Sequence, residues 1–456
     1  MKRLMLGNIL LKMDKAYFVV GLGYGDEGKG SIVDFLTEKF NTDTIVRFNG
    51  GSQAAHNVIN GQREHCFSQF GSGTFIPGTK TYLSPFMYID PISLVVEEEA
   101  LRQEGVSDAY SRLFINENCN VITPFQKYVG RMRELVLRNS SCGMGVGETV
   151  RDSIVLGNKQ LKIGDLKDKQ TLEDKLDFLR RVKLDQAEQL LEESQDLYMV
   201  RKYFEALKGD GTVEEVSREY QEFASRVNII DGYEFNGNVI FEGAQGILLD
   251  VQQGFYPFVT KTDSTLTNAE RLVNGSTGIE RVGVLRGYSN RHGKGPFVSE
   301  EKTLNEISKN ENNCYNVWQG DFRVGWFDLV ASKYALNVVG GVDCIALTNL
   351  DCLKEISPIK VCIGYQTNED VSEDHFVFER RRDKTLISAI ITDSCLSDVE
   401  KRKRTSVLMD AHPIYREFKD LDGYLKFLES EEGLGVPIGI KSYGPSRSNK
   451  ILNFNL

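Results

Sequence analysis

The sequence is poor in the residues that build metal and disulfide frameworks. Its eight cysteines are scattered without a CxxC pair, and only five histidines could assist them. These counts argue against a zinc site and a disulfide framework, and indicate reduced thiols in a cytosolic enzyme. Positive charge is also short, because 55 Lys and Arg stand against 65 Asp and Glu. The net charge of −10 argues against a broad nucleic-acid-binding face.

Long apolar runs, repeats and proline-rich hinges are missing as well. No apolar stretch in the 456 residues approaches the length of a transmembrane helix. The composition is nevertheless that of a globular protein, with 41% hydrophobic and 26% charged residues. Ten prolines stand beside 42 glycines, and this surplus indicates tight turns and close backbone approaches to ligands.

Short apolar runs alternate with helical patterns along the chain, and several runs end in loops that carry Gly or Asp. This alternation predicts an α/β fold with a large, mostly parallel central sheet, flanking helices and ligand loops at one edge. The runs are 15–22, 44–48, 238–241, 342–347, 359–363 and 436–440.

The domain organisation follows from the same pattern. We expect residues 15–456 to form a single domain, preceded by an N-terminal extension, 1–14, that lacks a cleavage site. Residues 167–228 are rich in charged residues, with Leu and Phe at helical spacing, and predict a helical insertion. The basic run at 401–404 is expected to be a solvated surface face.

The strongest local signal is the glycine loop GYGDEGKG at 23–30, between an apolar strand and an amphipathic helix. In that context, glycines let main-chain N–H groups face phosphates, and Lys29 supplies charge. Gly30 replaces the Ser or Thr that normally holds magnesium. Asp26 and Glu27 would repel a nucleotide unless one binds a cation or takes a proton. A glycine-rich turn with solvated acids is the alternative.

Two further loops carry candidate side chains. His56 closes a second glycine loop and could be a general acid, although a lone histidine is more often structural. Asp351 follows a buried strand, and a carboxylate suits the N1–H and N2–H2 edge of guanine. Each signal is weak alone.

Together the loops resemble the adenylosuccinate synthetase family, which joins aspartate to IMP using GTP. The resemblance runs from about residue 18 to residue 451. It is carried in order by GDEGKG at 25–30, GG-x-x-A-x-H at 50–56, FEGAQG at 241–246, YPFVT at 256–260, GKGPF at 293–297, GWFD at 325–328, N-L-D at 349–351 and GPSR at 444–447.

The resemblance implies a C–N bond-forming ligase of purine biosynthesis, with roles for individual residues. Asp26 would take the N1 proton of the purine, and His56 would assist phosphoryl transfer to O6. The GTP contacts would be Gly25, Glu27, Gly28, Lys29, Gly30, Ser31, Asn349, Leu350, Asp351, Ser442, Tyr443 and Gly444. The purine-nucleotide contacts would be Asp26, Lys29, Gln53, His56, Ser141, Cys142, Gln245 and Thr260. Mg²⁺ would lie on Asp26 and the Ala55 carbonyl, in a cytoplasmic homodimer that binds neither nucleic acid nor membrane.

The acceptor side departs from the family pattern. Ser141-Cys142 stands in place of Thr-Thr, and Gln53 in place of Asn. An arginine that the family lends across the dimer has no clear match. The arginine-rich aspartate loop is replaced by a stretch in which Trp318, Gln319 and Arg323 are the amino-acid contacts, with Arg323 as its cation.

These departures leave alternatives open beside IMP and aspartate. One is the same chemistry on another purine monophosphate, such as GMP or dGMP, or with another amine donor. A second is a GTP-binding regulator without ligase activity, which the retention of Asp26, Lys29 and His56 together disfavours.

Overall fold

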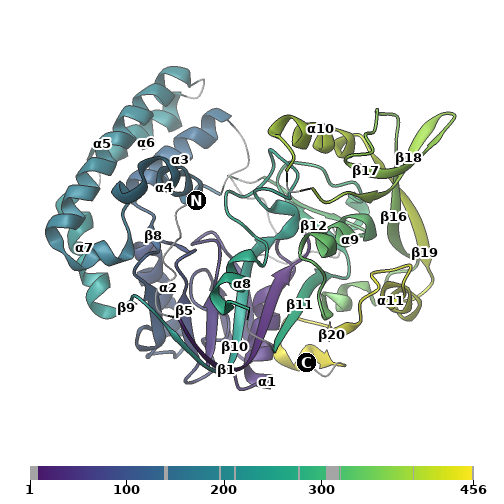
Figure 1. The fold of residues 1–456 in the computed structure, drawn as a ribbon, viewed down its shortest axis with the longest axis horizontal. Coiled ribbons are helices and arrows are strands. Elements are labelled where there is room, and N and C mark those ends of the chain that lie inside the picture. Colours follow the sequence, from purple (N-terminus) through teal and green to yellow (C-terminus); the bar gives the residue numbers. More distant parts are fainter. Residues whose placement is uncertain are drawn as a thin grey trace. The chain divides into compact units, whose positions relative to one another are not determined.

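The computed structural model describes residues 9–137, 142–194, 197–209, 212–275, 278–304, 318, 320–393 and 395–453. Its main sheet has ten strands in the order β21-β20-β15-β11-β1-β10-β2-β5-β7-β9. Helices flank the strands (Figure 1). The predicted α/β class with a large, mostly parallel sheet is confirmed. The sheet strands are β1 (Leu10–Gly21), β2 (Thr44–Arg47), β5 (Lys80–Leu83), β7 (Leu113–Asn116), β9 (Asn228–Ile230), β10 (Glu234–Gly246), β11 (Ile279–Arg286), β15 (Cys344–Thr348), β20 (Ile438–Ser442) and β21 (Lys450–Leu452).

Contacts divide the chain into two compact units. The first comprises Met1–Ala16, Val33–Ala244 and Thr267–Gly278, and the second comprises Tyr17–Ile32, Gln245–Leu266 and Ile279–Leu456. The glycine loop belongs to the second unit, whereas the loop before His56 belongs to the first.

In the first unit, β10, β2, β5, β7 and β9 pair in parallel. The β2 strand is buried over its whole length, although Thr44 and Arg47 flank its two apolar residues. The other elements of this unit are the strands β3 (His56–Asn60), β4 (Arg63–Phe67), β6 (Tyr88–Ile89) and β8 (Asn120–Val121), and the helices α2 (Pro91–Gln103), α3 (Pro124–Leu137), α4 (Val146–Leu156) and α8 (Thr267–Val273); α1 (Lys29–Lys39) begins in the second unit and continues into the first.

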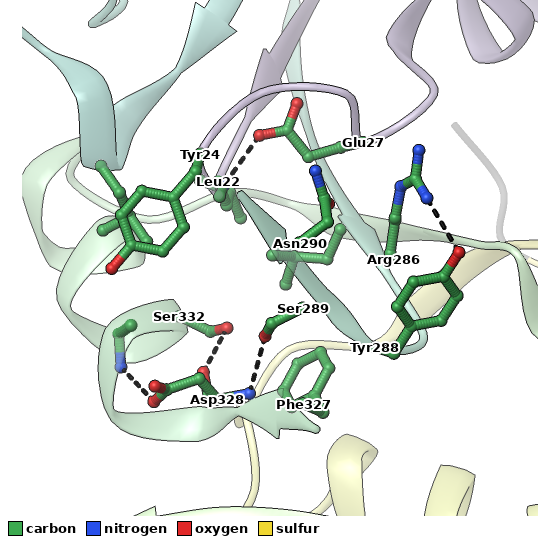
Figure 2. Close-up of a pocket in the computed structure, with 14 residues that line it drawn as sticks. Leu22, Tyr24, Glu27, Arg286, Tyr288, Ser289, Asn290, Phe327, Asp328 and Ser332 are labelled. Atoms are coloured by element: carbon green, nitrogen blue, oxygen red, sulfur yellow. Dashed lines mark hydrogen bonds between the residues drawn. The ribbon is translucent and has the colours of Figure 1, made fainter. Parts of the chain in front are cut away.

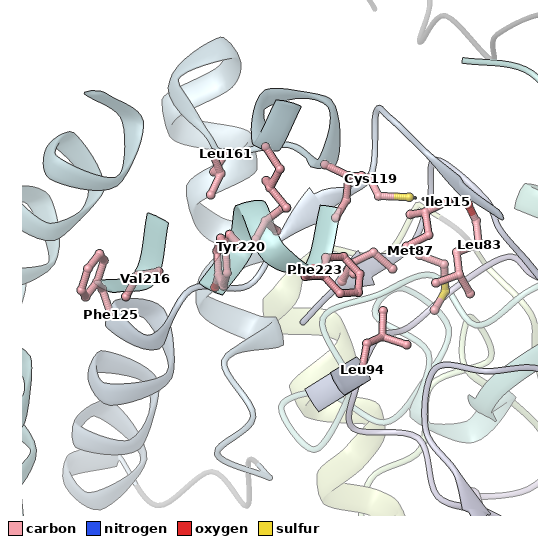
Figure 3. Packing of buried hydrophobic residues seen from close by; sticks show 14 of the residues in the cluster. Leu83, Met87, Leu94, Ile115, Cys119, Phe125, Leu161, Val216, Tyr220 and Phe223 are labelled. Carbon is pink, nitrogen blue, oxygen red and sulfur yellow. Dashed lines mark hydrogen bonds between the residues drawn. The ribbon is translucent and has the colours of Figure 1, made fainter. Parts of the chain in front are cut away.

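Three helices occupy the stretch 167–228: α5 (Lys169–Glu193), α6 (Leu197–Gly209) and α7 (Val213–Arg226). Asp168 caps α5, and a Thr212–Glu215 capping box starts α7. Their apolar stripes join the core of the unit; Figure 3 shows Tyr220 and Phe223 of α7 within it. The Tyr220 hydroxyl donates to the Ile122 carbonyl at 3.0 Å, so the one polar atom of this buried ring is satisfied.

In the second unit, β11, β15 and β20 are parallel neighbours, and β21 closes the edge in antiparallel orientation. A second sheet is formed by β14 (Phe327–Asp328), β16 (Ile359–Thr367), β18 (Lys384–Ile390) and β17 (Phe376–Arg381), with β19 (His412–Phe418) on β16. The remaining elements are the hairpin of β12 (Ser289–His292) and β13 (Phe322–Gly325), and the helices α9 (Leu329–Val338), α10 (Asp398–Met409) and α11 (Leu421–Glu429).

The basic run at 401–404 lies on α10, and the expectation of a solvated surface face is wrong for two of its four residues. Lys401 is 4% exposed and Arg404 is fully buried. Lys401 donates to Gln252 Oε1 at 2.6 Å, and Arg404 donates to the carbonyls of Gln253 and Gly254 at 3.1 Å. Half of the run therefore ties α10 to the segment that precedes YPFVT.

Candidate active site

The interior of the glycine loop is filled by Glu27. This carboxylate is 2% exposed, and its Oε1 accepts from the main-chain N–H groups of Gly23 at 3.0 Å and Gly25 at 2.9 Å. Its Oε2 accepts from Lys29 Nζ at 2.6 Å. Glu27 is thus an internal support of the loop, and its pairing with Lys29 explains how an acid is accommodated there.

The last glycine of FEGAQG packs against this loop. A Cβ on Gly246 would lie 2.2 Å from the Gly23 carbonyl oxygen and 2.4 Å from Glu27 Oε1. On another side, Thr348 Oγ1 donates to the Glu27 carbonyl at 2.7 Å. The loop is therefore held by contacts from two distant parts of the second unit, and only a glycine fits at position 246.

Asp26 is turned away from the loop interior. Its φ of 57° is left-handed, which is uncommon for a residue other than glycine, and its side chain is 35% exposed. His292 Nε2 lies 3.6 Å from its Oδ2, and Arg286 Nε donates to its main-chain oxygen at 2.5 Å. The carbonyl oxygen of the preceding residue, Gly25, accepts a hydrogen bond from Asn290 Nδ2 at 3.0 Å.

A small pocket adjoins the loop in the second unit and is lined by Tyr24, Glu27, Asn290 and Asp328, among other residues (Figure 2). Burial raises the pKa of Asp328 to about 6, although hydrogen bonds from Ala331 N and the Tyr365 hydroxyl oppose this increase. Asp328 also caps α9. We therefore assign it to the support of the pocket wall.

His56 begins β3 in the first unit and forms a buried pair with Glu242. The ring is 7% exposed, and its Nδ1 lies 2.6 Å from Glu242 Oε1. Glu242 also accepts from the Ser72 amide at 3.0 Å and from the Ser72 hydroxyl. A carboxylate at Nδ1 selects the tautomer of the imidazole and stabilises its protonated form.

Glu242 remains ionised in spite of its burial. Desolvation raises the pKa of this carboxyl, but the Arg47 charge and the hydrogen bonds from His56 and Ser72 outweigh it and lower the pKa to about 2. The motif FEGAQG therefore has two separate tasks: Glu242 holds His56, and Gly246 supports the glycine loop.

The predicted guanine contacts meet at neighbouring strand ends of the second unit. Strands β15 and β20 are parallel partners, and they deliver 349–351 and 442–444 to the same sheet edge. Asn349 is left-handed, with φ 57°, and Asp351 is exposed. Ser442 Oγ donates to the Gly444 carbonyl at 3.0 Å.

The predicted purine contacts show buried polar atoms. Among the residues that the structure describes, both polar side-chain atoms of Gln53 and the Oε1 of Gln245 are buried without a hydrogen-bond partner. A bound ligand or an ordered water is a common partner of such atoms. Thr260 Oγ1 lies 3.3 Å from the Thr262 hydroxyl, and Cys142 is partly buried; Ser141 lies outside the described residues.

The predicted amino-acid contacts are only partly described. Gln319 lies outside the described residues, and Trp318 is partly buried. The Arg323 guanidinium is bound within the protein: Nε donates to Glu300 Oε2 at 3.0 Å, Nη2 donates to the same oxygen, and Nη1 donates to the carbonyls of Gly293 and Gly295 at 3.0 Å. Arg323 therefore braces the β12–β13 hairpin.

Sequence reasoning assigned no roles to His292, Arg286, Asn290, Glu242 and Ser72. One signal was available, since three of these residues fall within 286–292, just before GKGPF at 293–297. Within the described residues, no three His, Cys, Asp or Glu side chains form a group that could hold a metal ion. None of the helices in the described ranges is long and apolar enough to span a membrane.

The fold and these loops define an α/β enzyme that uses a purine nucleotide. The sequence model of adenylosuccinate synthetase matches residues 18–451. The synthetase of Aquifex aeolicus is 32% identical over 95% of this chain and 96% of its own, and that of a Cyanothece species is 33% identical over 95% and 94%. The chain belongs to the adenylosuccinate synthetase family, whose members are GTP-dependent C–N bond-forming ligases.

Two solved structures share the fold. The fully ligated adenylosuccinate synthetase of Plasmodium falciparum superposes with a TM-score of 0.71, at 20% identity over 96% of this chain and 99% of that one. The succinoaminodeoxyadenylate synthetase of cyanophage S-2L, bound to dGMP and dATP, gives a TM-score of 0.58 at 15% identity over 97% of both chains. The predicted family and enzyme class are confirmed.

Proposed function

We propose that this chain joins L-aspartate to C6 of IMP at the expense of GTP, with Asp26 and His56 as catalytic residues. The observation that carries the assignment is that the two adjacent acids of the glycine loop occupy different environments. Glu27 fills the loop interior, whereas Asp26, one residue earlier, presents a partly exposed carboxylate. A general base must reach its substrate, and Asp26 meets that requirement.

The proposed reaction has two displacements. Asp26 removes the proton from purine N1, which makes O6 nucleophilic, and O6 attacks the γ-phosphorus of GTP while GDP leaves. The neutral aspartate amine then attacks C6, the O6–C6 bond breaks, inorganic phosphate leaves, and the new C6–N nitrogen releases one proton to solvent. His56, held by Glu242, donates a hydrogen bond to the oxygens on which negative charge develops.

Lys29 supplies positive charge toward the phosphates. Its side chain is buried and paired with Glu27, so its charge is held in place near the loop amides. Asp351 and the turn at 442–444 would bind guanine, which accounts for GTP as the phosphoryl donor. Gln53, Gln245 and Thr260 would hold the purine monophosphate.

Mg²⁺ fits the chemistry of the described residues. The ion prefers hard oxygen ligands, commonly one or two carboxylates together with substrate phosphates, and Asp26 offers such a carboxylate. The Ala55 carbonyl is the second proposed ligand. When bound, Mg²⁺ would neutralise charge on the phosphates.

The deciding experiment is a product assay by mass spectrometry with GTP, MgCl₂, L-aspartate and a panel of IMP, GMP, dGMP and AMP. We expect adenylosuccinate and phosphate in equal amounts with IMP. Asp26→Asn should abolish both products and still bind GTP. Phosphate release that does not depend on which purine monophosphate is present, or full activity of Asp26→Asn, would overturn the assignment.

A different amine donor is the second candidate. One observation favours it: the Arg323 guanidinium is bound to Glu300 and two carbonyls, so it is poorly placed to hold a substrate carboxylate. The same assay with IMP and a series of amino acids and simple amines separates the two candidates. A higher kcat/KM for an amine with fewer carboxylates than aspartate would support the second.

We also propose that 15–456 functions as one catalytic domain and acts as a homodimer in the cytoplasm. A single family model spans 18–451, which supports the first statement. The seven cysteines in the described ranges are free thiols, which is compatible with a reducing compartment. Light scattering coupled to size exclusion tests the dimer, and a measured mass near 51.4 kDa would refute it.

A further inference from the structure

The carboxylate of Asp26 has a basic neighbour that the proposed reaction does not use. His292 ends β12, in the same unit as the glycine loop, and its Nε2 lies 3.6 Å from Asp26 Oδ2. The His292 side chain is 19% exposed and that of Asp26 is 35% exposed, so the imidazole is mostly buried and the carboxylate is partly open to solvent. A small rotation of the Asp26 side chain would bring the pair within hydrogen-bond distance.

The His292 ring is held in place by the hairpin that carries it. It packs edge-on against Phe322 of β13, with ring centroids 4.8 Å apart and planes at 66°. The two residues are register partners across the hairpin. The Arg286 guanidinium lies over the same Phe322 ring at 5.6 Å, so the imidazole cannot move far without displacing a packed cluster.

The contacts of the two ring nitrogens indicate which one carries a proton. In the described part of the chain, Nδ1 is buried and has no hydrogen-bond partner, whereas Nε2 faces a carboxylate. A neutral ring with its proton on Nε2 places the donor against the acceptor, and a charged ring carries a proton there as well. In either form, an N–H group points toward Asp26 Oδ2.

The segment that carries His292 also binds the main chain at Asp26. A left-handed residue other than glycine is strained and is stable only where its surroundings impose the conformation. Arg286 binds the Asp26 carbonyl at 2.5 Å, and Asn290 binds the preceding carbonyl at 3.0 Å. The segment 286–292 therefore holds the backbone at Asp26 and places an imidazole 3.6 Å from its carboxylate.

We propose that His292 is a positioning residue for the catalytic base. By contacting Oδ2 of Asp26, it sets the orientation of the carboxylate that meets the N1 proton of the purine and that is the proposed Mg²⁺ ligand. The proposal rests on the proposed function for the role of Asp26. A carboxylate free to rotate would spend less time in the reactive orientation, and misplacement of a reacting group by about 1 Å lowers a rate on the order of 100-fold.

The test compares His292→Ala with His292→Gln, whose amide nitrogen can reach the place of Nε2. We expect kcat to fall about 10- to 100-fold in His292→Ala, with the KM for GTP changed less than about 3-fold. His292→Gln should recover most of the activity, and added imidazole should raise kcat of the Ala variant. His412→Ala, at an exposed histidine on β19, is the matched control and should show neither the loss nor the rescue.

Crystal structures of the wild type and His292→Ala provide a readout that does not depend on ligation. We expect the Asp26 carboxylate to rotate in the variant while Glu27 stays in place. If the wild type makes no ligated product, the proposed function fails, but this rotation still tests the role of His292. An unmoved Asp26, or a loss of activity that neither glutamine nor imidazole restores, would overturn the proposal.

Discussion

Replacement of Glu242 by glutamine tests the buried pair that holds His56. The substitution keeps the shape of the side chain and removes its charge. In the wild type, Glu242 Oε1 lies 2.6 Å from His56 Nδ1, and both groups are buried. A buried hydrogen bond to a charged group contributes about 1.5–3 kcal/mol, which corresponds to about 10- to 150-fold in rate if it acts only in the transition state.

The pKa of Glu242 gives a second measure of the free energy that stabilises its ionised form. The difference between its ordinary value of 4.5 and about 2 corresponds to about 3 kcal/mol, which is the net of desolvation and the opposing effects of Arg47, His56 and Ser72. Because the folded-state pKa is lowered, this stabilisation is complete above about pH 4.5 and is lost as the pH falls toward 2. We therefore expect kcat of Glu242→Gln to fall about 10- to 100-fold at pH 7.

The variant also removes the negative charge that acts on the buried Arg47 guanidinium, so we expect its folding stability to fall as well. Urea unfolding and steady-state kinetics on the same preparation separate the two effects. Ser72→Ala is the matched control, because it removes one hydrogen bond from Glu242 and keeps its charge. A kcat within 2-fold of wild type, or a loss that equals the unfolded fraction, would refute the role given to Glu242.

Two further substitutions test the supports of the site. Gly246→Ala should abolish GTP-dependent activity, because its Cβ would lie 2.2 Å from the Gly23 carbonyl oxygen. Gly209→Ala is the control: its Cβ would have no heavy atom within 4 Å, so neither activity nor folding should change by more than about 1 kcal/mol. Activity of Gly246→Ala near that of wild type would contradict this packing. Asp328 has a raised pKa, so its ionisation should lower wild-type stability by about 3 kcal/mol as the pH rises from about 4 to above 6. Urea unfolding of Asp328→Asn should lack this decline, and parallel curves for the two proteins would contradict the assignment.

Local patterns predicted the fold class and the order of the loops. Buried parallel strands read as nearly continuous apolar runs, as in 344–347, and glycines mark the places where the main chain turns sharply. Helical spacing likewise predicted helices over 167–228, where α5, α6 and α7 lie. These features depend on neighbouring residues, so a linear sequence contains them.

Contacts between residues far apart in the sequence could not be predicted from these local patterns. The two acids of the glycine loop are adjacent in sequence and similar in chemistry, and only the turn at Asp26 sends one carboxylate inward and the other outward. The basic run at 401–404 read as a solvated face, because nothing local indicates that Arg404 finds two carbonyls some 150 residues away.

The sequence by itself determined that this chain is an α/β enzyme of the adenylosuccinate synthetase family, since ordered motifs and apolar periodicity are properties of the chain alone. The tertiary structure decided which atoms those motifs bring together. Glu242 meets His56 across 186 residues, and His292 meets Asp26 across the second unit. Such contacts depend on strand order and hairpin register, which bring distant residues within a few ångströms of each other.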